Sequence, residues 1–177
     1  MDEEKLKYQI AISLLPGIGS VNAKKLIAYA SSIEGVFELK AKQICKIPGI
    51  GAVVARQIAE ANPLEKAEEE IEFIKKNDIK TSFFLDNDYP ARLKPLPDAP
   101  FLIFMKGNVD LDTAKVVSIV GTRNATDYGK EICTSLVTEL AERGHNPLIV
   151  SGLAYGIDIT AHKAAIKNNL PTAAVLG

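Results

Sequence analysis

The most constraining feature of the sequence is the stretch VVSIVGTRNATDYG, which runs from Val116 to Gly129. It begins with a short β-branched apolar run that Gly121 ends, a pattern typical of a central strand in a parallel sheet covered on both faces. A polar loop follows, and then a segment from about Asp127 to Arg143 with apolar residues at helical spacing. We expect this helix to pack on the sheet through Ile132, Leu136, Val137 and Leu140.

The same order of strand and helix continues along the chain. PLIVSG is typical of a second apolar strand, LAYGIDITAHKAAIKNN of a helix after a glycine turn, and TAAVLG of a third strand. Such alternation implies right-handed crossovers and therefore a doubly wound parallel sheet of the α/β class. Because the third strand ends at Gly177, we expect the sheet to be truncated here and to continue in a longer protein.

The first third of the sequence contains an internal duplication. LLPGIGSVNAKKLI returns as KIPGIGAVVARQIAEA, in which Gly49 follows its equivalent Gly17 at an offset of 32 residues. Each copy resembles the helix-hairpin-helix motif, in which glycines let the backbone approach a phosphate and the next helix offers free N–H groups. This predicts an all-α, SAM-like domain that either binds DNA or serves only as a packing module. The possible phosphate contacts are Gly17, Gly19, Lys24, Gly49, Gly51 and Arg56.

The chain divides into three predicted parts. Residues 1–62 form the helical domain, residues 63–78 a charge-rich linker helix, and residues 79–177 the first part of the α/β domain. Early in that third part, IKTSFFL and FLIFM are expected strands. Four prolines between them favour an extended connector across the surface: Pro90, Pro95, Pro97 and Pro100.

Composition limits the kind of partner and the compartment. The net charge is -1, so nucleic-acid binding must use a local basic patch rather than the field of the whole molecule. The two cysteines, Cys45 and Cys133, lack metal-ligand spacing, which predicts buried thiols in a reduced intracellular protein without a metal site. No apolar run is long enough for a membrane span or a signal peptide, so we expect a cytoplasmic protein that uses no membrane.

The loops GTRNATDYG and SGLAYGID follow two strands of the predicted sheet, at the edge where parallel sheets bind ligands. The GxGxxG spacing is absent, which argues against a dinucleotide and leaves no cofactor predicted. Arg123 has the rigid fork that grips a phosphate, and tyrosines can stack on bases. The predicted binding residues are Gly121, Thr122, Arg123, Asn124, Thr126 and Tyr128 in the first loop and Ser151, Gly152, Tyr155 and Gly156 in the second.

The second loop and the helix after it also contain the residue types of a hydrolytic triad. Asp158 and His162 are four residues apart and Ser151 is close in sequence, but the pattern G-x-S-x-G is absent. A carboxylate and a histidine on one helix face are more often a local structural pair, so no catalytic residues are predicted. Asp158 is either a partner of the helix dipole or a ligand contact.

Three stretches resemble the DNA-processing protein A family, also called DprA or Smf. They are YPARLKPLPDAPFLIFMKGN, SIVGTRNATDYG and IVSGLAYGIDITAHKAAI with the trailing AAVLG. The resemblance implies a Rossmann-like domain and a non-enzymatic role in natural transformation, competence and DNA recombination. The family binds single-stranded DNA with the arginine that corresponds to Arg123, protects that DNA, helps to load RecA and forms homodimers. The position of Tyr155 is often basic in relatives.

Two other functions remain open at this stage. Related Rossmann-like folds include nucleotide-phosphate hydrolases, although no paired carboxylates are well placed for general acid and base work here. Alternatively, the hairpin pair is the DNA-binding module and the α/β part is its scaffold.

Overall fold

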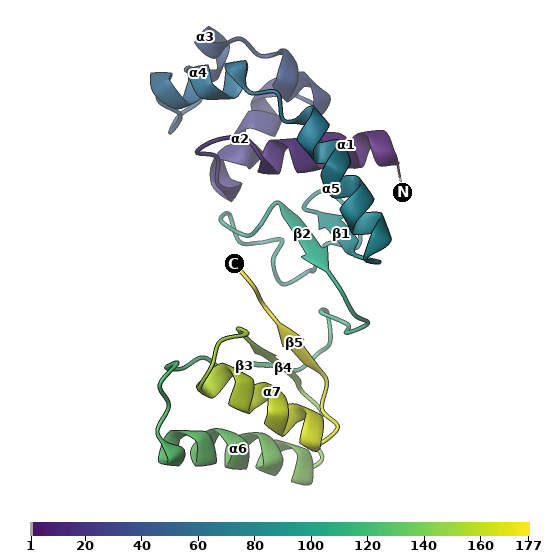
Figure 1. The fold of residues 1–177 in the computed structure, drawn as a ribbon, viewed down its shortest axis with the longest axis vertical. Helices are drawn as coiled ribbons and strands as arrows, with labels where there is room; N and C mark the ends of the chain where they lie inside the picture. The colour runs from purple at the N-terminus through teal and green to yellow at the C-terminus, as the bar shows by residue number, and fades with distance from the viewer. Residues whose placement is uncertain (1) are drawn as a thin grey trace. The chain divides into compact units, whose positions relative to one another are not determined.

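The computed structural model describes residues 2–177 and contains two compact units, Met1–Lys106 and Gly107–Gly177 (Figure 1). The first unit is mainly helical and ends in a short antiparallel β-ribbon. The second is an α/β unit with a parallel sheet. This is the predicted fold class: a helix-hairpin-helix region followed by a small parallel sheet with helices.

The helices of the first unit are α1 (Glu3–Ser13), α2 (Ser20–Ala30), α3 (Ala41–Ile44), α4 (Ala52–Glu60) and α5 (Leu64–Lys76), with a 3-10 helix η1 (Glu34–Glu38) after α2. The Asp2 side chain accepts a hydrogen bond from the Lys5 N–H and so caps α1. Turns join α1 to α2 and α3 to α4, and these are the two predicted hairpins.

The duplication extends to the backbone of these turns. Gly17 and Gly49, the first glycine of each copy, have φ of 68° and 95°, values that favour glycine. The second glycine of each copy, Gly19 or Gly51, is the extended N-cap of the following helix, and neither cap carries a side-chain hydrogen bond. The two sequence copies therefore fold as two equivalent turns.

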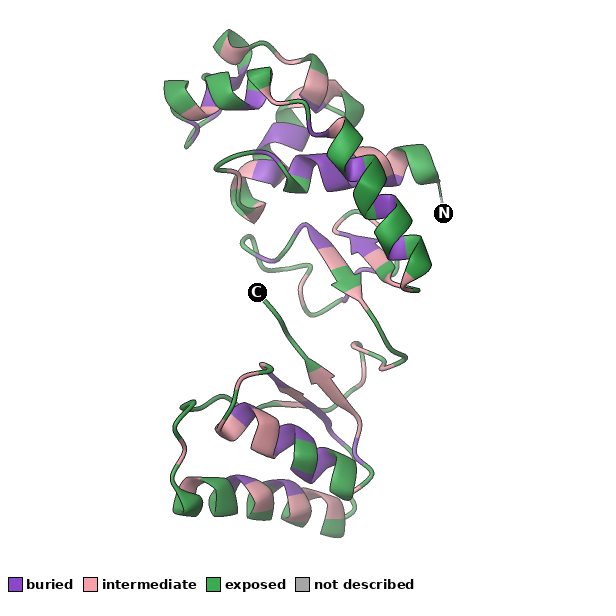
Figure 2. Ribbon diagram, in the orientation of Figure 1, coloured by how far each residue is buried: buried purple, intermediate pink, exposed green. Residues whose placement is uncertain are grey.

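One continuous core unites the first unit. It includes Leu6 and Ile10 of α1, Leu26 of α2 and Ile71 of α5, and it extends to Phe83 (Figure 2). Strand β1 (Lys80–Phe83) pairs antiparallel with β2 (Leu102–Met105). These are the two strands that the sequence predicted in IKTSFFL and FLIFM. Helix α5 packs on α1. The domain boundaries at residues 62 and 78 stay predictions.

The proline-rich segment between β1 and β2 is not the extended connector that we expected. It is a series of tight turns whose N–H groups bond three residues back, as in Leu93 to Pro90 and Leu96 to Leu93. Tyr89 is fully buried, and its hydroxyl donates to the Pro100 carbonyl. Proline fixes φ at a value that type I turns also use, so the same prolines fit turns as readily as extended chain.

The second unit contains strands β3 (Val116–Ser118), β4 (Leu148–Ser151) and β5 (Thr172–Ala174) in the parallel order β3-β4-β5. The central strand among the described residues is therefore β4, whereas the sequence predicted β3. Helices α6 (Asp127–Glu142) and α7 (Ile157–Lys167) lie on one side of the sheet (Figure 1). The sequence predicted a sheet covered on both faces, but within residues 2–177 helices cover only one. Ser118, the last residue of β3, and Val120, two residues further on, are exposed, whereas Val117 and Ile119 pack against the core that includes residues of α6 and α7, so Ser118 and Val120 point to the opposite face of the sheet.

The contact face of helix α6 agrees with the prediction at Val137, which is fully buried, and in part at Leu140, but not at Ile132 and Leu136. Cys133 and Val137 are buried against α7, whereas Ile132 and Leu136 are about half exposed (Figure 2). The reason is that α6 packs chiefly on α7 rather than directly on the sheet, so its contact face is rotated by about one residue.

Two further sequence predictions have different outcomes. Cys133 is buried as expected, and burial raises the pKa of its thiol. Cys45 is exposed, which corrects the prediction that both thiols are interior, because it lies at the C-cap of the four-residue helix α3. Over residues 2–177, every helix falls short of the length and apolarity that crossing a bilayer demands.

Candidate functional site

The two predicted loops of the second unit lie against each other through glycines. A Cβ on Gly121 would lie 2.5 Å from Ile157 Cγ1, at the first residue of α7. Gly156 has a φ of 86°, and a Cβ there would overlap the Thr122 carbonyl oxygen and lie 2.6 Å from that of Arg123. Glycine is thus required at both positions, and these close contacts bring the loops into one site.

Backbone and hydroxyl hydrogen bonds fix the first loop against the two helices. The Ile157 N–H donates to the Thr122 carbonyl at 3.2 Å, and the Asn124 N–H donates to Thr122 Oγ1 at 3.2 Å. Thr126 is the N-cap of α6, where its hydroxyl accepts from the Gly129 N–H at 3.1 Å. The hydroxyls of Thr122 and Thr126 thus already shape the loop.

An open hollow of about 490 Å³ lies where the loops meet. Within residues 2–177, the Arg123 guanidinium makes no ion pair or hydrogen bond with another protein group. The backbone N–H groups of Leu153, Ala154 and Tyr155 likewise donate to no acceptor in the described part of the chain. Guanidinium and backbone N–H groups are donors that bind anions in proteins. The hollow is lined by Arg123, Gly152, Leu153, Ala154, Tyr155, Asp158, Val175, Leu176 and Gly177.

The two predicted tyrosines are placed differently. Tyr155 lines the hollow and is 86% exposed. Tyr128 is 73% exposed in the first turn of α6 and is not among the residues that line the hollow. Both rings are accessible to a base, but Tyr155 alone of this pair adjoins Arg123.

The structure contradicts a Ser-His-Asp triad. Ser151 is buried, and its hydroxyl donates to the Ile119 carbonyl at 2.6 Å. His162 Nε2 donates to the Gly152 carbonyl at 2.7 Å, and its Nδ1 lies 2.7 Å from Thr172 Oγ1. The histidine therefore bonds to neither the serine nor Asp158. Ser151 holds β4 to the end of β3, so its predicted contact with a ligand would have to use backbone atoms.

Asp158 is the residue of this site that the sequence left undecided. It is 7% exposed, and its Oδ1 has no hydrogen-bond partner in the described structure. It makes no capping hydrogen bond, since the N-cap of α7 is Gly156, but it lies in the first turn of α7, where a carboxylate interacts favourably with the helix dipole. Gly152 makes room for the carboxylate, because a Cβ there would lie 2.5 Å from Asp158 Oδ2. Leu153, Val175 and Leu176 also line the hollow, and no sequence pattern singled them out.

In the hairpins, tertiary contacts occupy the lysines. Lys24 Nζ donates to the carbonyls of Leu96 and Pro97, and it lies 5.6 Å from the centre of the Phe84 ring. Lys25 Nζ donates to the Pro48 carbonyl at 2.9 Å. Among the predicted hairpin cations in residues 2–177, Arg56 alone has no protein partner.

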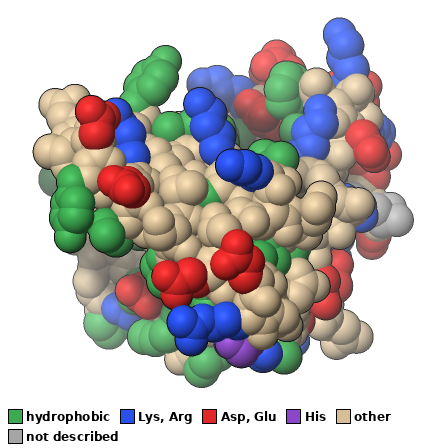
Figure 3. All heavy atoms as spheres, turned by 90° about the horizontal axis from the view of Figure 1, so that it is seen from below, with side chains coloured by type: hydrophobic (Ala, Val, Ile, Leu, Met, Phe, Trp, Pro, Cys, Tyr) green, Lys and Arg blue, Asp and Glu red, His purple; other side chains and the backbone are tan. Residues whose placement is uncertain are grey.

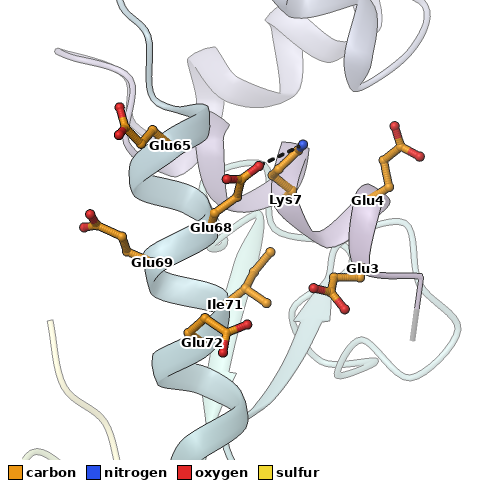
Figure 4. A pocket seen from close by; sticks show the side chains of 8 residues that line it. All are labelled: Glu3, Glu4, Lys7, Glu65, Glu68, Glu69, Ile71 and Glu72. Carbon is orange, nitrogen blue, oxygen red and sulfur yellow. Dashed lines mark hydrogen bonds and ion pairs between the residues drawn. The ribbon is translucent and has the colours of Figure 1, made fainter.

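A second hollow, of about 640 Å³, is lined by residues of α1 and α5 and is strongly acidic (Figure 4). Lys7 pairs with Glu68 at 3.2 Å, and Lys75 pairs with Glu3 at 2.8 Å. The bond to Glu3 raises the pKa of the Lys75 ammonium. Such a surface repels phosphates. Six glutamates line it: Glu3, Glu4, Glu65, Glu68, Glu69 and Glu72.

Charge does not concentrate into one basic face in the view of Figure 3, where lysine and arginine side chains are interspersed with carboxylates. This agrees with a net charge of -1. The composition predicts that a phosphate site on this chain would be local, and Arg123, which has no partner within residues 2–177, is a local feature of that kind.

The fold and the loops define a class: tandem helix-hairpin-helix proteins with a Rossmann-like α/β part that carries glycine loops at the carboxyl ends of its strands. Comparison with family models agrees with both parts. Residues 10–61 match the SAM-like helix-hairpin-helix tandem, and residues 80–177 match DNA recombination-mediator protein A. The chain belongs to the DNA recombination-mediator protein A family.

Individual relatives agree with this assignment. The chain is 30% identical to Protein Smf of Synechocystis sp., over all of this chain and 45% of the relative. It is 42% identical to DNA processing protein DprA of Streptococcus pneumoniae, over 52% of this chain and 32% of the relative. The X-ray structure of the pneumococcal protein matches with a TM-score of 0.70 at 31% identity, over 96% of this chain and 56% of that one. The chain thus spans less than half the length of these curated relatives.

Proposed function

We propose that this chain binds single-stranded DNA at the hollow between the loops of the second unit. The observation that carries the proposal is the partnerless Arg123 guanidinium beside the free N–H groups of residues 153–155. Phosphate is the anion that suits this arrangement, because a guanidinium binds two of its oxygens at once and backbone N–H groups add further bonds. The name of the pneumococcal relative, DNA processing protein, and that of the family, DNA recombination-mediator protein A, support DNA as the source of the phosphate.

Single-stranded rather than duplex DNA fits the aromatic side chains. Tyr155 in the hollow and Tyr128 nearby in sequence expose rings on which unpaired bases can stack, and stacking tolerates any base sequence. Duplex DNA hides the faces of its bases. In the whole protein, this binding protects incoming DNA, assists RecA loading in natural transformation and recombination, and operates in a homodimer.

A binding role is favoured over the hydrolase alternative. Ser151 and His162 are both engaged in hydrogen bonds that hold the sheet and the second loop together. The free groups in the hollow are a permanent cation and a carboxylate, and a guanidinium cannot act as a general base. The hairpins contribute less than the loops, because Lys24 and Lys25 are bound to backbone carbonyls.

Fluorescence anisotropy with a labelled oligo-dT strand tests the proposal. We expect Arg123→Ala to weaken binding about tenfold at moderate salt, and to reduce the slope of log affinity against log salt by about 0.7, the contribution of one phosphate contact. A hydrolase would instead release phosphate or base from mononucleotides.

The matched control is Arg143→Ala. Arg143 is also an arginine of the second unit, but it is exposed at the end of α6 and pairs with Glu139 at 3.1 Å. Both variants lose one positive charge, so a general electrostatic effect weakens them equally. The proposed role of Arg123 is wrong if the two variants bind alike at every salt concentration.

A further inference from the structure

A buried histidine holds the backbone at the start of the second loop. His162 of α7 is 6% exposed, and its Nε2 lies 2.7 Å from the Gly152 carbonyl oxygen. A carbonyl oxygen only accepts hydrogen bonds, so Nε2 carries a proton and donates it there. Gly152 follows β4 and lines the hollow together with Arg123, whereas His162 is not among the lining residues. The imidazole is therefore one hydrogen bond away from the wall of the loop site.

Strand β5 fixes the imidazole from its other side. Thr172 Oγ1 lies 2.7 Å from Nδ1 of His162 and 2.9 Å from the Ile149 carbonyl oxygen. The hydroxyl donates to Nδ1 when the ring is neutral and accepts from it when the ring is an imidazolium. In both arrangements the ring is held in place and Nε2 remains the donor to Gly152.

The bond to Gly152 also sets the direction of the next N–H group. The C=O and N–H of a planar trans peptide point in opposite directions, and every peptide bond within residues 2–177 is trans. Because the Gly152 carbonyl points toward His162, the Leu153 N–H points away from the imidazole. This N–H donates to no acceptor within residues 2–177, and Leu153 lines the hollow. The N–H is thus an open donor beside Arg123.

A buried carboxylate competes for this N–H. Gly152 packs on Asp158, since a Cβ on Gly152 would lie 2.5 Å from Asp158 Oδ2. The other oxygen, Oδ1, is buried and has no hydrogen-bond partner in the described structure. A peptide next to such an acceptor gains a charge-assisted hydrogen bond if its N–H turns inward. That turn would break the bond between the Gly152 carbonyl and His162, so the histidine opposes it.

We propose that His162 is a positioning residue of the phosphate site. By holding the Gly152 carbonyl, it keeps the Leu153 N–H available to a phosphate of the strand and away from Asp158. The inference rests on the proposed function and deepens it, since it assigns the direction of one N–H donor to a side chain outside the hollow. His162 itself contacts no DNA.

Fluorescence anisotropy with labelled oligo-dT tests the role of His162 in three variants. We expect His162→Ala to bind about tenfold more weakly, the effect of one lost hydrogen bond to a charged group. The slope of log affinity against log salt stays that of the parent, because no cation is removed from a phosphate. His162→Gln, whose amide can donate to the same carbonyl, recovers affinity to within about threefold of the parent.

The matched control is Val137→Ala. Val137 is fully buried where α6 packs on α7, so its truncation destabilises the same unit without touching the second loop. We expect it to bind oligo-dT as the parent does at a temperature where both are folded. A His162→Ala variant that binds no more weakly than Val137→Ala overturns the inference. Thr172→Val, which only loosens the imidazole, repeats the comparison should His162→Ala fold poorly, and we then expect a loss of about threefold.

Two further measurements separate positioning from a merely structural role. The Leu153 amide proton should move downfield in ¹H–¹⁵N spectra when oligo-dT is added to the parent and stay in place in His162→Ala. Asp158→Ala should improve affinity more in the His162→Ala background than in the parent, because it removes the competing acceptor. Equal improvement in both backgrounds overturns the competition with Asp158. If Arg123→Ala leaves all binding unchanged, the proposed function fails. If Arg123→Ala weakens binding while His162→Ala binds as the parent, only the positioning role fails.

Discussion

The two units place glycines in front of helices in similar ways but leave different groups available. In the hairpins, Lys24 and Lys25 bond to carbonyls of the same unit. In the loop site, Arg123 and three consecutive N–H groups are unused within the described residues. A glycine turn before a helix therefore creates the opportunity for phosphate binding. Which cations stay free is decided by the surrounding packing.

The largest effect that sharpens this comparison is expected at Gly156. Gly156→Ala combines a positive φ with overlap against two backbone carbonyls, whereas a Cβ on Gly17 would lie 3.6 Å from Val54 in ordinary contact. We expect unfolding free energy to fall by about 3 kcal/mol or more for Gly156→Ala, and by about 1 kcal/mol for Gly17→Ala, where only φ is strained.

Urea denaturation followed by far-ultraviolet circular dichroism measures both variants. DNA binding adds a second readout, since Gly156→Ala separates the loops and should abolish most affinity. Equal destabilisation of the two variants would show that the close contact between the loops adds nothing to the stability of the second unit. The comparison of the two units would then lose its structural basis.

An intermediate effect is expected at His162. His162→Ala leaves the Gly152 carbonyl without its donor and removes the contact with Thr172, which we expect to lower unfolding free energy by about 2 kcal/mol. The control is His145→Ala, since His145 is exposed. A catalytic histidine would behave differently: its removal would abolish turnover of a nucleotide at unchanged stability, and that result would return the hydrolase to consideration.

Much of the fold was predictable because it depends on local pattern. The period of apolar residues and the two Pro-Gly-Ile-Gly turns gave the helices of both hairpins, and glycine-terminated apolar runs gave the three parallel strands. The predictions that failed depend on neighbours. Whether β3 is a central strand depends on the order of the strands, and the contact face of α6 depends on its packing against α7. Neither can be read from an isolated segment.

The site was predictable to a similar depth. Residue type and position after a strand pointed to Arg123 and Gly156, and these lie at the meeting point of the loops. Spacing alone could not decide whether Asp158 caps its helix or whether Lys24 is free. For Lys24 the answer depends on atoms far away in the sequence, the carbonyls of Leu96 and Pro97, 72 and 73 residues from it. For Asp158 it depends on the exact start of α7, where Gly156 is the N-cap.

The smallest effect is therefore expected at Lys24. Its replacement tests most directly whether the hairpins and the loop site differ in DNA binding. Because the Lys24 ammonium bonds to two carbonyls and lies over the Phe84 ring, Lys24→Ala should lower stability by about 1 kcal/mol and change affinity for oligo-dT by less than about twofold. Arg56→Ala is the companion variant, since Arg56 has no partner within residues 2–177 and its loss would expose any hairpin contribution. Anisotropy under the conditions used for Arg123→Ala compares all three. A loss at Lys24 as large as that at Arg123 would mean that DNA displaces the lysine from its carbonyls, and the hairpins would then be a principal binding surface.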